Sequence, residues 1–387
     1  MSIRNRAAIV GAFEHPLRKA PDKTTAQLHA EVAFGAVKDA GLSMSDIDGY
    51  FCAGDAPGTG PLSMVDYLNL KVRHVGSTDT GGSAYLSHVS HAAQAIAAGK
   101  CDVALVTLAG RPRSEGASAS AAQDARIPDV QWEEPFGATT PTLYALAARR
   151  HMHEYGTTAE QLAWVKVAAS HHAQHNPHAM LPKVVTVEEV VNSPMVSAPL
   201  HRLDCCVVSD GGGAVIVARP EIARDLKRPV VSIRGAGEAI SGQNGGAFDI
   251  TRSGGGRSAA AAFEEAGVRA ADIRYASIYD SFTITVIIQL EDIGFCAKGT
   301  GGAFVADGGL ISGAGRLAVN TDGGGLCNNH PAFRGGMTKI IETVRQLRGE
   351  AHPAVQVPDL ALGLVHGTGW LLGTRHGSAT LVLERLS

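Results

Sequence analysis

Apolar runs and capped helical segments alternate along this chain. The segments VALVTLA (103–109) and LALGLV (360–365) are almost continuously apolar, which is typical of strands covered on both faces of a sheet. The clearest helix boundary is a capping box of Thr24 and Gln27, which opens a helix that Gly41 ends. This alternation predicts an α/β fold.

The same order of sequence pieces occurs twice. In each half, a predicted helix ends at Ala-Gly and is followed, after a turn, by Asp-Ile. A glycine-rich turn comes next, then a loop that leads into an apolar strand. A second apolar strand closes each half. The matching pairs, first half against second, are 38–50 with 264–276, 78–84 with 321–327, 97–110 with 352–369, and 211–220 with 376–386. Four pairs in one order indicate a duplicated α/β unit.

We therefore divide the chain near residue 222. The first unit is 1–222 and the second is 223–387. Residues 111–200 have no counterpart in the second half, so we interpret them as an insertion between two strands of the first half.

Composition narrows the class of protein. Apolar residues make up 45% of the chain and charged residues 18%, which excludes an intrinsically disordered protein. A net charge of −3 argues against a general affinity for nucleic acid or anionic membranes. No apolar run approaches the roughly 20 residues of a membrane span. The cysteines form no Cys-x-x-Cys pair, which indicates neither a zinc ribbon nor a disulfide framework, so we expect a cytoplasmic protein. The histidines of 171–178 lack carboxylates at a matching spacing, so we expect no metal site.

Five longer motifs resemble those of a known family. They are GGSAYLSHVSHAAQAIAAG (81–99), PLHRLDCCVVSDGGGAVIV (199–217), YDSFTITVIIQLEDIGFC (279–296), NTDGGGLCNNHPAFRGG (320–336) and LVHGTGW (364–370). Together they resemble the thiolase superfamily, in particular sterol-carrier-protein-type thiolases and lipid-transfer thiolase-like proteins. The resemblance covers essentially the whole chain. It implies a thiolase-like fold of two duplicated halves in five layers, αβαβα.

The resemblance also implies a site for acyl-CoA chemistry. Thiolases make or break a carbon–carbon bond beside a thioester, which needs a thiolate at a helix start and a second acid/base. The nucleophilic cysteine falls on Ser83, the histidine of the Gly-His-Pro motif on His330, and the second cysteine on His366. Tyr279 stands where the resembling enzymes carry asparagine or histidine. Both family cysteines are therefore replaced.

Ser83 has two open interpretations. A serine hydroxyl is far less acidic than a thiol, and a helix N-terminus alone does not activate it. Ser83 is then either a helix cap or small filler in a former nucleophile pocket, or an acyl acceptor that His330 activates.

The remaining motif residues have predicted roles around the same substrate. His330, in a glycine-rich loop, is expected to polarise the thioester or ketone oxygen, as in the resembling enzymes. We expect His366 at the end of an apolar strand, as a general base or as a hydrogen-bonded structural histidine. Tyr279 is either a proton donor to an alkoxide or carbonyl, or a core tyrosine. The expected substrate-binding residues are Asp280, Asn320, Gly324 and Gly369.

These residues favour retro-aldol cleavage of a β-hydroxyacyl-CoA. In this hypothesis Tyr279 or His366 removes the hydroxyl proton, and His330 with backbone donors holds the thioester enolate. Two alternatives stay open: an acyltransferase or thiolase that uses Ser83, and a catalytically silent subunit that binds acyl-CoA or lipid. The resemblance also implies coenzyme A as part of the substrate, a homodimer, and a separate partner protein with a zinc ribbon and an OB-fold.

Overall fold

The computed structural model describes residues 2–54, 56–117, 130–137, 139–242 and 246–386. Within them, ten strands form one mixed sheet, in the order β10-β9-β11-β12-β8-β1-β7-β4-β2-β3. The strands of its first half are β1 (Ala8–Glu14), β2 (Gly49–Phe51), β3 (His74–Gly76), β4 (Val103–Gly110) and β7 (Gly211–Ala218). Those of its second half are β8 (Val231–Ser241), β9 (Tyr275–Ile278), β10 (Ala318–Val319), β11 (Leu362–Leu371) and β12 (Thr374–Arg385).

The two halves of the sheet have the same strand order and directions. In each, the three strands at the outer edge pair in parallel, and the two that follow pair antiparallel. A short antiparallel pairing of Ala8 and Ile9 with Ser232 and Val231 joins β1 to β8. The division near residue 222, which falls in the connection between β7 and β8, stays a prediction.

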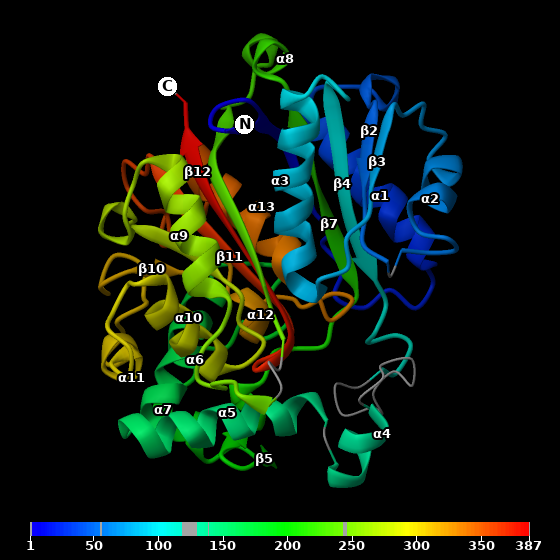
Figure 1. Cartoon of the computed structure of the whole chain (residues 1–387). Coiled ribbons are helices and arrows are strands. Elements are labelled where there is room, and N and C mark those ends of the chain that lie inside the picture. The colour runs from blue at the N-terminus through cyan, green and yellow to red at the C-terminus, as the bar shows by residue number, and fades with distance from the viewer. Residues whose placement is uncertain (1, 55, 118–129, 138, 243–245, 387) are drawn as a thin grey trace.

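Helices cover both faces of each half. The helices outside the segment between β4 and β7 are α1 (Thr25–Ala40), α2 (Pro61–Tyr67), α3 (Ala84–Ala97), α8 (Pro220–Asp225), α9 (Gly255–Ala266), α10 (Thr283–Ile293), α11 (Gly301–Val305), α12 (Gly324–Cys327) and α13 (Gly336–Arg348). Helices α3 and α13 lie between the two halves of the sheet, with α1 outside the first half and α9 outside the second (Figure 1). The predicted α/β class is confirmed, and the layers follow the order αβαβα.

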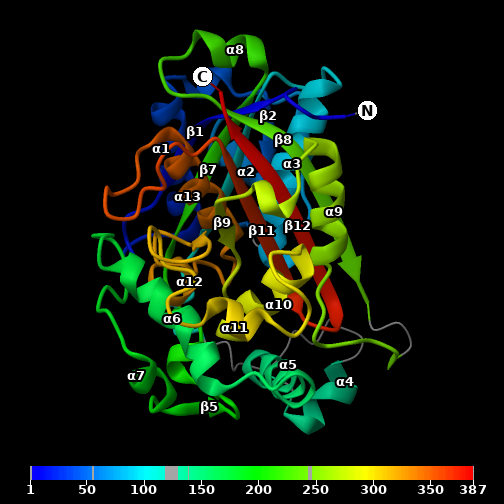
Figure 2. The same cartoon turned by 90° about the vertical axis from the view of Figure 1, so that its left-hand side faces the viewer.

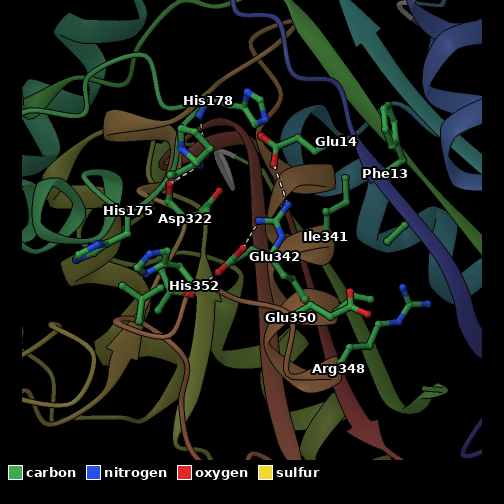
Figure 3. Close-up of a pocket in the computed structure, with 17 residues that line it drawn as sticks. Phe13, Glu14, His175, His178, Asp322, Ile341, Glu342, Arg348, Glu350 and His352 are labelled. Carbon is green, nitrogen blue, oxygen red and sulfur yellow. Dashed lines mark hydrogen bonds and ion pairs between the residues drawn. The ribbon is translucent and has the colours of Figure 1, made fainter. Parts of the chain in front are cut away.

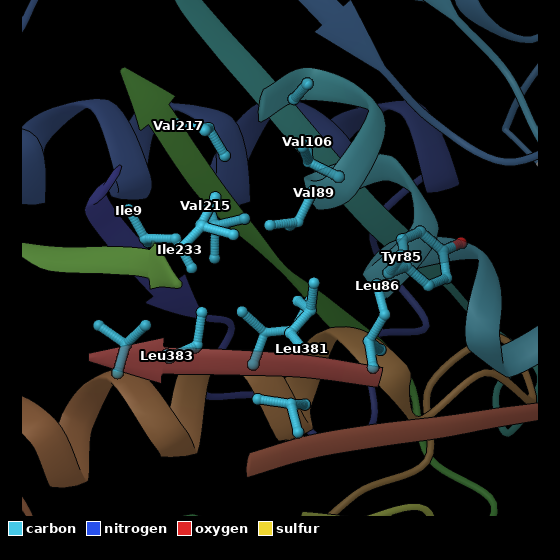
Figure 4. Close-up of a cluster of buried hydrophobic side chains, with 14 of the residues drawn as sticks. Ile9, Tyr85, Leu86, Val89, Val106, Val215, Val217, Ile233, Leu381 and Leu383 are labelled. Atoms are coloured by element: carbon cyan, nitrogen blue, oxygen red, sulfur yellow. The ribbon is translucent and has the colours of Figure 1, made fainter. Parts of the chain in front are cut away.

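The largest buried cluster fills the space around α3 and α13. Val106 and Val215 from the first half face Ile233 and Leu381 from the second, with Val89 of α3 between them, and all five side chains are fully buried (Figure 4). Each such aliphatic side chain contributes roughly 1.5–3 kcal/mol relative to an exposed one. This burial holds the N-termini of α3 and α13 at a fixed place between the halves.

The segment between β4 and β7 forms a group of elements at one end of the molecule. It contains α4 (Val130–Glu133), α5 (Thr140–Tyr155), α6 (Ala159–Ala173), α7 (Val187–Val191), β5 (Met195–Ser197) and β6 (Leu200–His201). Helix α6 packs against α10, α11 and α12. Figure 2 shows α4, α5 and α7 below the ends of the sheet strands. In the part of the chain that the structure describes, no helix is long and apolar enough to cross a membrane.

The predicted boundaries of α1 agree with the structure, whereas the predicted end of β11 does not. Thr24 and Gln27 form both bonds of the capping box, and Gly41 ends α1 in the left-handed conformation. The predicted end of a strand at His366 is wrong, because β11 continues to Leu371. The strand continues since Gly367 and Gly369 pair with β12.

Candidate active site

Tyr279 and His330 form a buried hydrogen-bonded pair. Tyr279 directly follows β9, and its Oη lies 2.8 Å from Nε2 of His330. Both residues are at most 5% exposed. The Tyr279 hydroxyl also lies 3.3 Å from the Phe333 carbonyl oxygen and accepts from the Gly335 amide at 3.3 Å. The sequence therefore identified two residues, 51 positions apart, that meet in the fold.

The pair is held in its uncharged forms. Burial raises the pKa of the Tyr279 phenol well above its ordinary value, although the Gly335 amide opposes this. Burial, with a smaller contribution from the positive charge of Lys339, lowers the pKa of His330 to about 3. At neutral pH the imidazole is therefore neutral and accepts a proton, while the phenol keeps its own.

Close backbone approach encloses the pair. A Cβ on Gly82, just before α3, would lie 2.2 Å from Cε2 of Tyr279. A Cβ on Gly335, just before α13, would lie 3.1 Å from Cδ2 of His330. Glycine is required at Gly82 because any side chain there would overlap the phenol ring. The N-terminal ends of the two central helices thus form walls of the site.

Ser83 lies next to this site, but its hydroxyl is bonded away from the pair. Its Oγ donates to the Thr80 carbonyl oxygen at 2.7 Å and lies 3.1 Å from Thr80 Oγ1. A Cβ on Gly377 of β12 would lie 2.7 Å from the same Oγ. The hydroxyl makes no cap bond to α3, so the helix-cap interpretation is not supported. The small-filler interpretation fits these contacts.

His366 faces the other side of β11. Its Nδ1 lies 2.8 Å from Thr380 Oγ1, and a Cβ on Gly255 of α9 would lie 3.3 Å from its Nε2. The neighbouring Gly367 faces Ser83 instead, because successive strand residues point to opposite faces. The predicted grouping of His366 with Ser83, Tyr279 and His330 is therefore not what the fold produces.

The burial of His366 predicts a pH-dependent stability. Burial, with a further contribution from His376, lowers its pKa to about 3, whereas an unfolded histidine has a pKa of about 6.5. Between these values only the unfolded chain binds the proton, so the free energy of unfolding falls as pH falls. For this residue the slope is at most about 1.4 kcal/mol per pH unit. Urea titrations at pH 7, 6 and 5 should show a shallower slope in His366→Gln, and an unchanged slope would contradict this.

Asp280 is part of a buried ion pair beside the site. Its Oδ1 lies 2.6 Å from Nζ of Lys339, and each side chain is 1% exposed. The carboxylate also accepts from the Gly325 amide at 2.8 Å and the Leu326 amide at 3.1 Å. Burial raises the pKa of Asp280, and Lys339 opposes that rise. Asp280 thus fixes α12 and α13 against Tyr279, and its predicted contact with substrate stays a prediction.

The other predicted substrate-binding residues have structural contacts. The Asn320 amide donates to the Ile278 carbonyl oxygen and accepts from its N–H, both at 2.8 Å. A Cβ on Gly324 would lie 2.2 Å from Asp280 Oδ2, and one on Gly369 would lie 1.7 Å from the Thr80 carbonyl oxygen. These glycines permit close backbone packing around the site.

A cavity of about 410 Å³ opens on another side of α13. Figure 3 shows Glu14, Asp322 and Glu342 at its wall, with His175 and His352 nearby. Its lining does not include Ser83, Tyr279, His330 or His366. Glu14 and Lys339 also surround the site. No sequence motif predicted them, because they contact residues that are far away in the sequence.

Comparisons with known proteins identify the family and the fold. A family model described as thiolase C-terminal domain-like matches residues 237–385. An acetyl-CoA acetyltransferase of Methanothermobacter thermautotrophicus is 35% identical over 381 residues, which cover 95% of this chain and 97% of that protein. The 17-hydroxy-3-oxo-4-pregnene-20-carboxyl-CoA lyase of Mycobacterium tuberculosis is 34% identical over 372 residues, which cover 90% of this chain and 92% of that protein.

One solved structure is similar over almost the full length. It is described as an Ltp2-ChsH2(DUF35) aldolase and has a TM-score of 0.88 and 34% identity to this chain. The similarity covers 99% of this chain and 98% of that one. The predicted thiolase-like fold is confirmed by this similarity.

Proposed function

Because the chain belongs to the thiolase superfamily, we propose that it is an acyl-CoA lyase of the aldolase type. In this proposal it cleaves the carbon–carbon bond of a β-hydroxyacyl-CoA without forming an acyl-enzyme. One observation carries the proposal: a neutral Tyr279–His330 pair in a buried site, where residue 83 is a serine whose hydroxyl is bonded elsewhere.

The pair supplies the acid/base chemistry that a retro-aldol cleavage needs. The Tyr279 hydroxyl takes the proton of the substrate alcohol while its own proton moves 2.8 Å to Nε2 of His330. The Cα–Cβ electron pair then moves onto the thioester, which leaves a ketone or aldehyde and an enolate. Return of the proton through Tyr279 to Cα gives the acyl-CoA product, so the cleavage consumes no net proton and no free CoA.

The second ring nitrogen of His330, Nδ1, is available to stabilise the negative charge that develops on the thioester oxygen. Among the described residues, this nitrogen has no hydrogen-bond partner. In the tautomer in which Nε2 accepts from Tyr279, Nδ1 carries the hydrogen and can donate to the thioester oxygen. Proton transfer to Nε2 makes the ring an imidazolium, which strengthens this bond as the enolate forms.

The relatives support the substrate class and a partner. The Mycobacterium tuberculosis relative is a 17-hydroxy-3-oxo-4-pregnene-20-carboxyl-CoA lyase. We propose that the substrate of this chain is likewise a bulky β-hydroxyacyl-CoA. The similar solved structure is a complex with a DUF35 protein, and we propose a separate partner of this class for this chain.

Replacement of Ser83 by alanine tests the acyltransferase alternative. Among the residues that the structure describes, no histidine bonds the Ser83 hydroxyl, so the variant should keep kcat for cleavage within about threefold of the wild type. Steady-state assays should include Ser90→Ala, a similarly buried serine on α3, as the control. A loss of 100-fold or more in Ser83→Ala alone would favour the acyl-serine mechanism.

Product analysis tests the proposed function itself. The purified chain is incubated with a β-hydroxyacyl-CoA and, separately, with acetoacetyl-CoA plus CoA, each with and without a DUF35 partner. A carbonyl compound together with a shortened acyl-CoA is the expected result. CoA-dependent cleavage of acetoacetyl-CoA would indicate a thiolase, and tight CoA binding without turnover under all conditions would indicate a silent subunit.

A further inference from the structure

Glu14, the last residue of β1, gathers an unusual set of donors on one carboxylate. Its Oε1 accepts from Asn329 Nδ2 at 2.6 Å and from Asn328 Nδ2 at 3.1 Å. Arg18 donates to the same oxygen at 2.6 Å, and Arg345 lies 3.3 Å from Oε2. The Glu14 side chain is only 9% exposed, at the wall of the cavity in Figure 3.

The two asparagines directly precede His330. Asn328 also accepts from Arg18 at 2.7 Å and donates to Asp322 at 2.9 Å, so its side chain is fixed from three directions. The Asn329 side chain donates to Glu14, and among the described residues its Oδ1 has no partner. The backbone amides of both asparagines donate to the Gly324 carbonyl oxygen, at 2.8 and 3.2 Å, and Glu14 is the partner that their two side chains share.

The His330 ring needs such an external support. Ala332 and Phe333, just beyond it, both have left-handed backbone angles, with φ of 53° and 56°. These angles are costly for residues with side chains, so the surrounding contacts must hold the loop in place. The His330 amide donates to Ser209 Oγ at 2.9 Å, which fixes the backbone at this residue, while Glu14 fixes the side chains of the two residues before it.

We propose that Glu14 is a positioning residue that sets His330 against Tyr279. The carboxylate holds Asn328 and Asn329, and these place the imidazole at hydrogen-bond distance from the phenol. The consequence for catalysis rests on the proposed lyase function. The consequence for geometry does not, because the Tyr279–His330 distance is measurable without turnover.

Glu14→Gln is the sharpest substitution. It keeps the size of the side chain but removes the negative charge. One of the two oxygens becomes an N–H₂ group, which cannot accept the hydrogen bonds that Arg18 and the asparagines donate. Glu350→Gln is the matched control, because Glu350 lines the same cavity, is exposed, and pairs with Arg228 at 2.6 Å outside this network.

Kinetics give the first readout. In Glu14→Gln we expect kcat to fall about 10- to 100-fold with KM within about threefold, because a small misplacement of a reacting group affects the chemical step. Glu350→Gln should leave both values unchanged. Equal kcat in the two variants, or a rise in KM alone, would overturn the proposal.

Crystal structures of the two variants give the second readout, which does not need activity. The distance from Tyr279 Oη to His330 Nε2 should exceed 3.5 Å in Glu14→Gln and stay near 2.8 Å in Glu350→Gln. A retained bond in Glu14→Gln would overturn the positioning role even if the wild type proves inactive as a lyase. If Glu14→Gln does not fold, Asn329→Ala removes the shortest asparagine bond and should show the same widening, whereas a retained bond there would overturn the role equally.

Discussion

Tyr279→Phe is expected to lower kcat for β-hydroxyacyl-CoA cleavage by about 10²- to 10⁴-fold. The variant keeps the ring that packs against Gly82 but loses the hydroxyl that lies 2.8 Å from His330. KM should change little, because the ring contacts remain and only the proton path is interrupted. Steady-state release of the carbonyl product, followed over a range of substrate concentrations, separates the two parameters.

Tyr275→Phe is the control for this substitution. Tyr275 lies on β9 four residues earlier and is fully buried, with its hydroxyl 2.7 Å from Ser277 Oγ. It should keep kcat within about threefold, since losing one such neutral bond costs stability of about 1 kcal/mol and not chemistry. If Tyr279→Phe behaved like Tyr275→Phe, Tyr279 would be a core tyrosine and the proton path would be wrong.

Lys339→Met should produce the largest loss of stability, about 3–5 kcal/mol in the free energy of unfolding. Asp280 would keep its two amide donors but lose the cation that lies 2.6 Å away, at a place where both side chains are only 1% exposed. A buried carboxylate without its counter-charge is costly, so the folded state is penalised. Urea unfolding at pH 7 measures the change.

A double substitution separates the ion pair from simple packing. Lys339→Met with Asp280→Asn removes both charges while an amide oxygen can still accept from Gly325 or Leu326, so most of the lost stability should return. A double variant as unstable as Lys339→Met, or a single variant within 1 kcal/mol of the wild type, would show that the pair is not important for folding.

The architecture could be predicted because its signals are local or repeated. The capping box at Thr24 and the apolar run 103–109 depend on neighbouring residues only. The order of matched pieces in the two halves agrees with the identical strand orders of the sheet. The predicted end of β11 was wrong because the apolar run stops at Val365, whereas the strand continues through Gly367 and Gly369. Glycine is needed at Gly369 because the Thr80 carbonyl oxygen leaves no room for a side chain there.

The site could be predicted only in part. Tyr279 and His330 belong to motifs whose order resembles that of a known family, and the fold brings them together. The face of β11 on which His366 lies depends on strand register, which its own sequence does not specify. Lys339 could not be predicted because its partner, Asp280, lies 59 residues before it in the sequence. The two residues come together only in the folded core.

Cleavage of a β-hydroxyacyl-CoA in D₂O, without added CoA, tests the central claim most directly. The account predicts one deuterium at Cα of the acyl-CoA product, because the enolate is protonated from a site in exchange with solvent. It also predicts no increase in the intact mass of the protein during turnover. A cleavage that requires free CoA and adds an acyl group to Ser83 would contradict it.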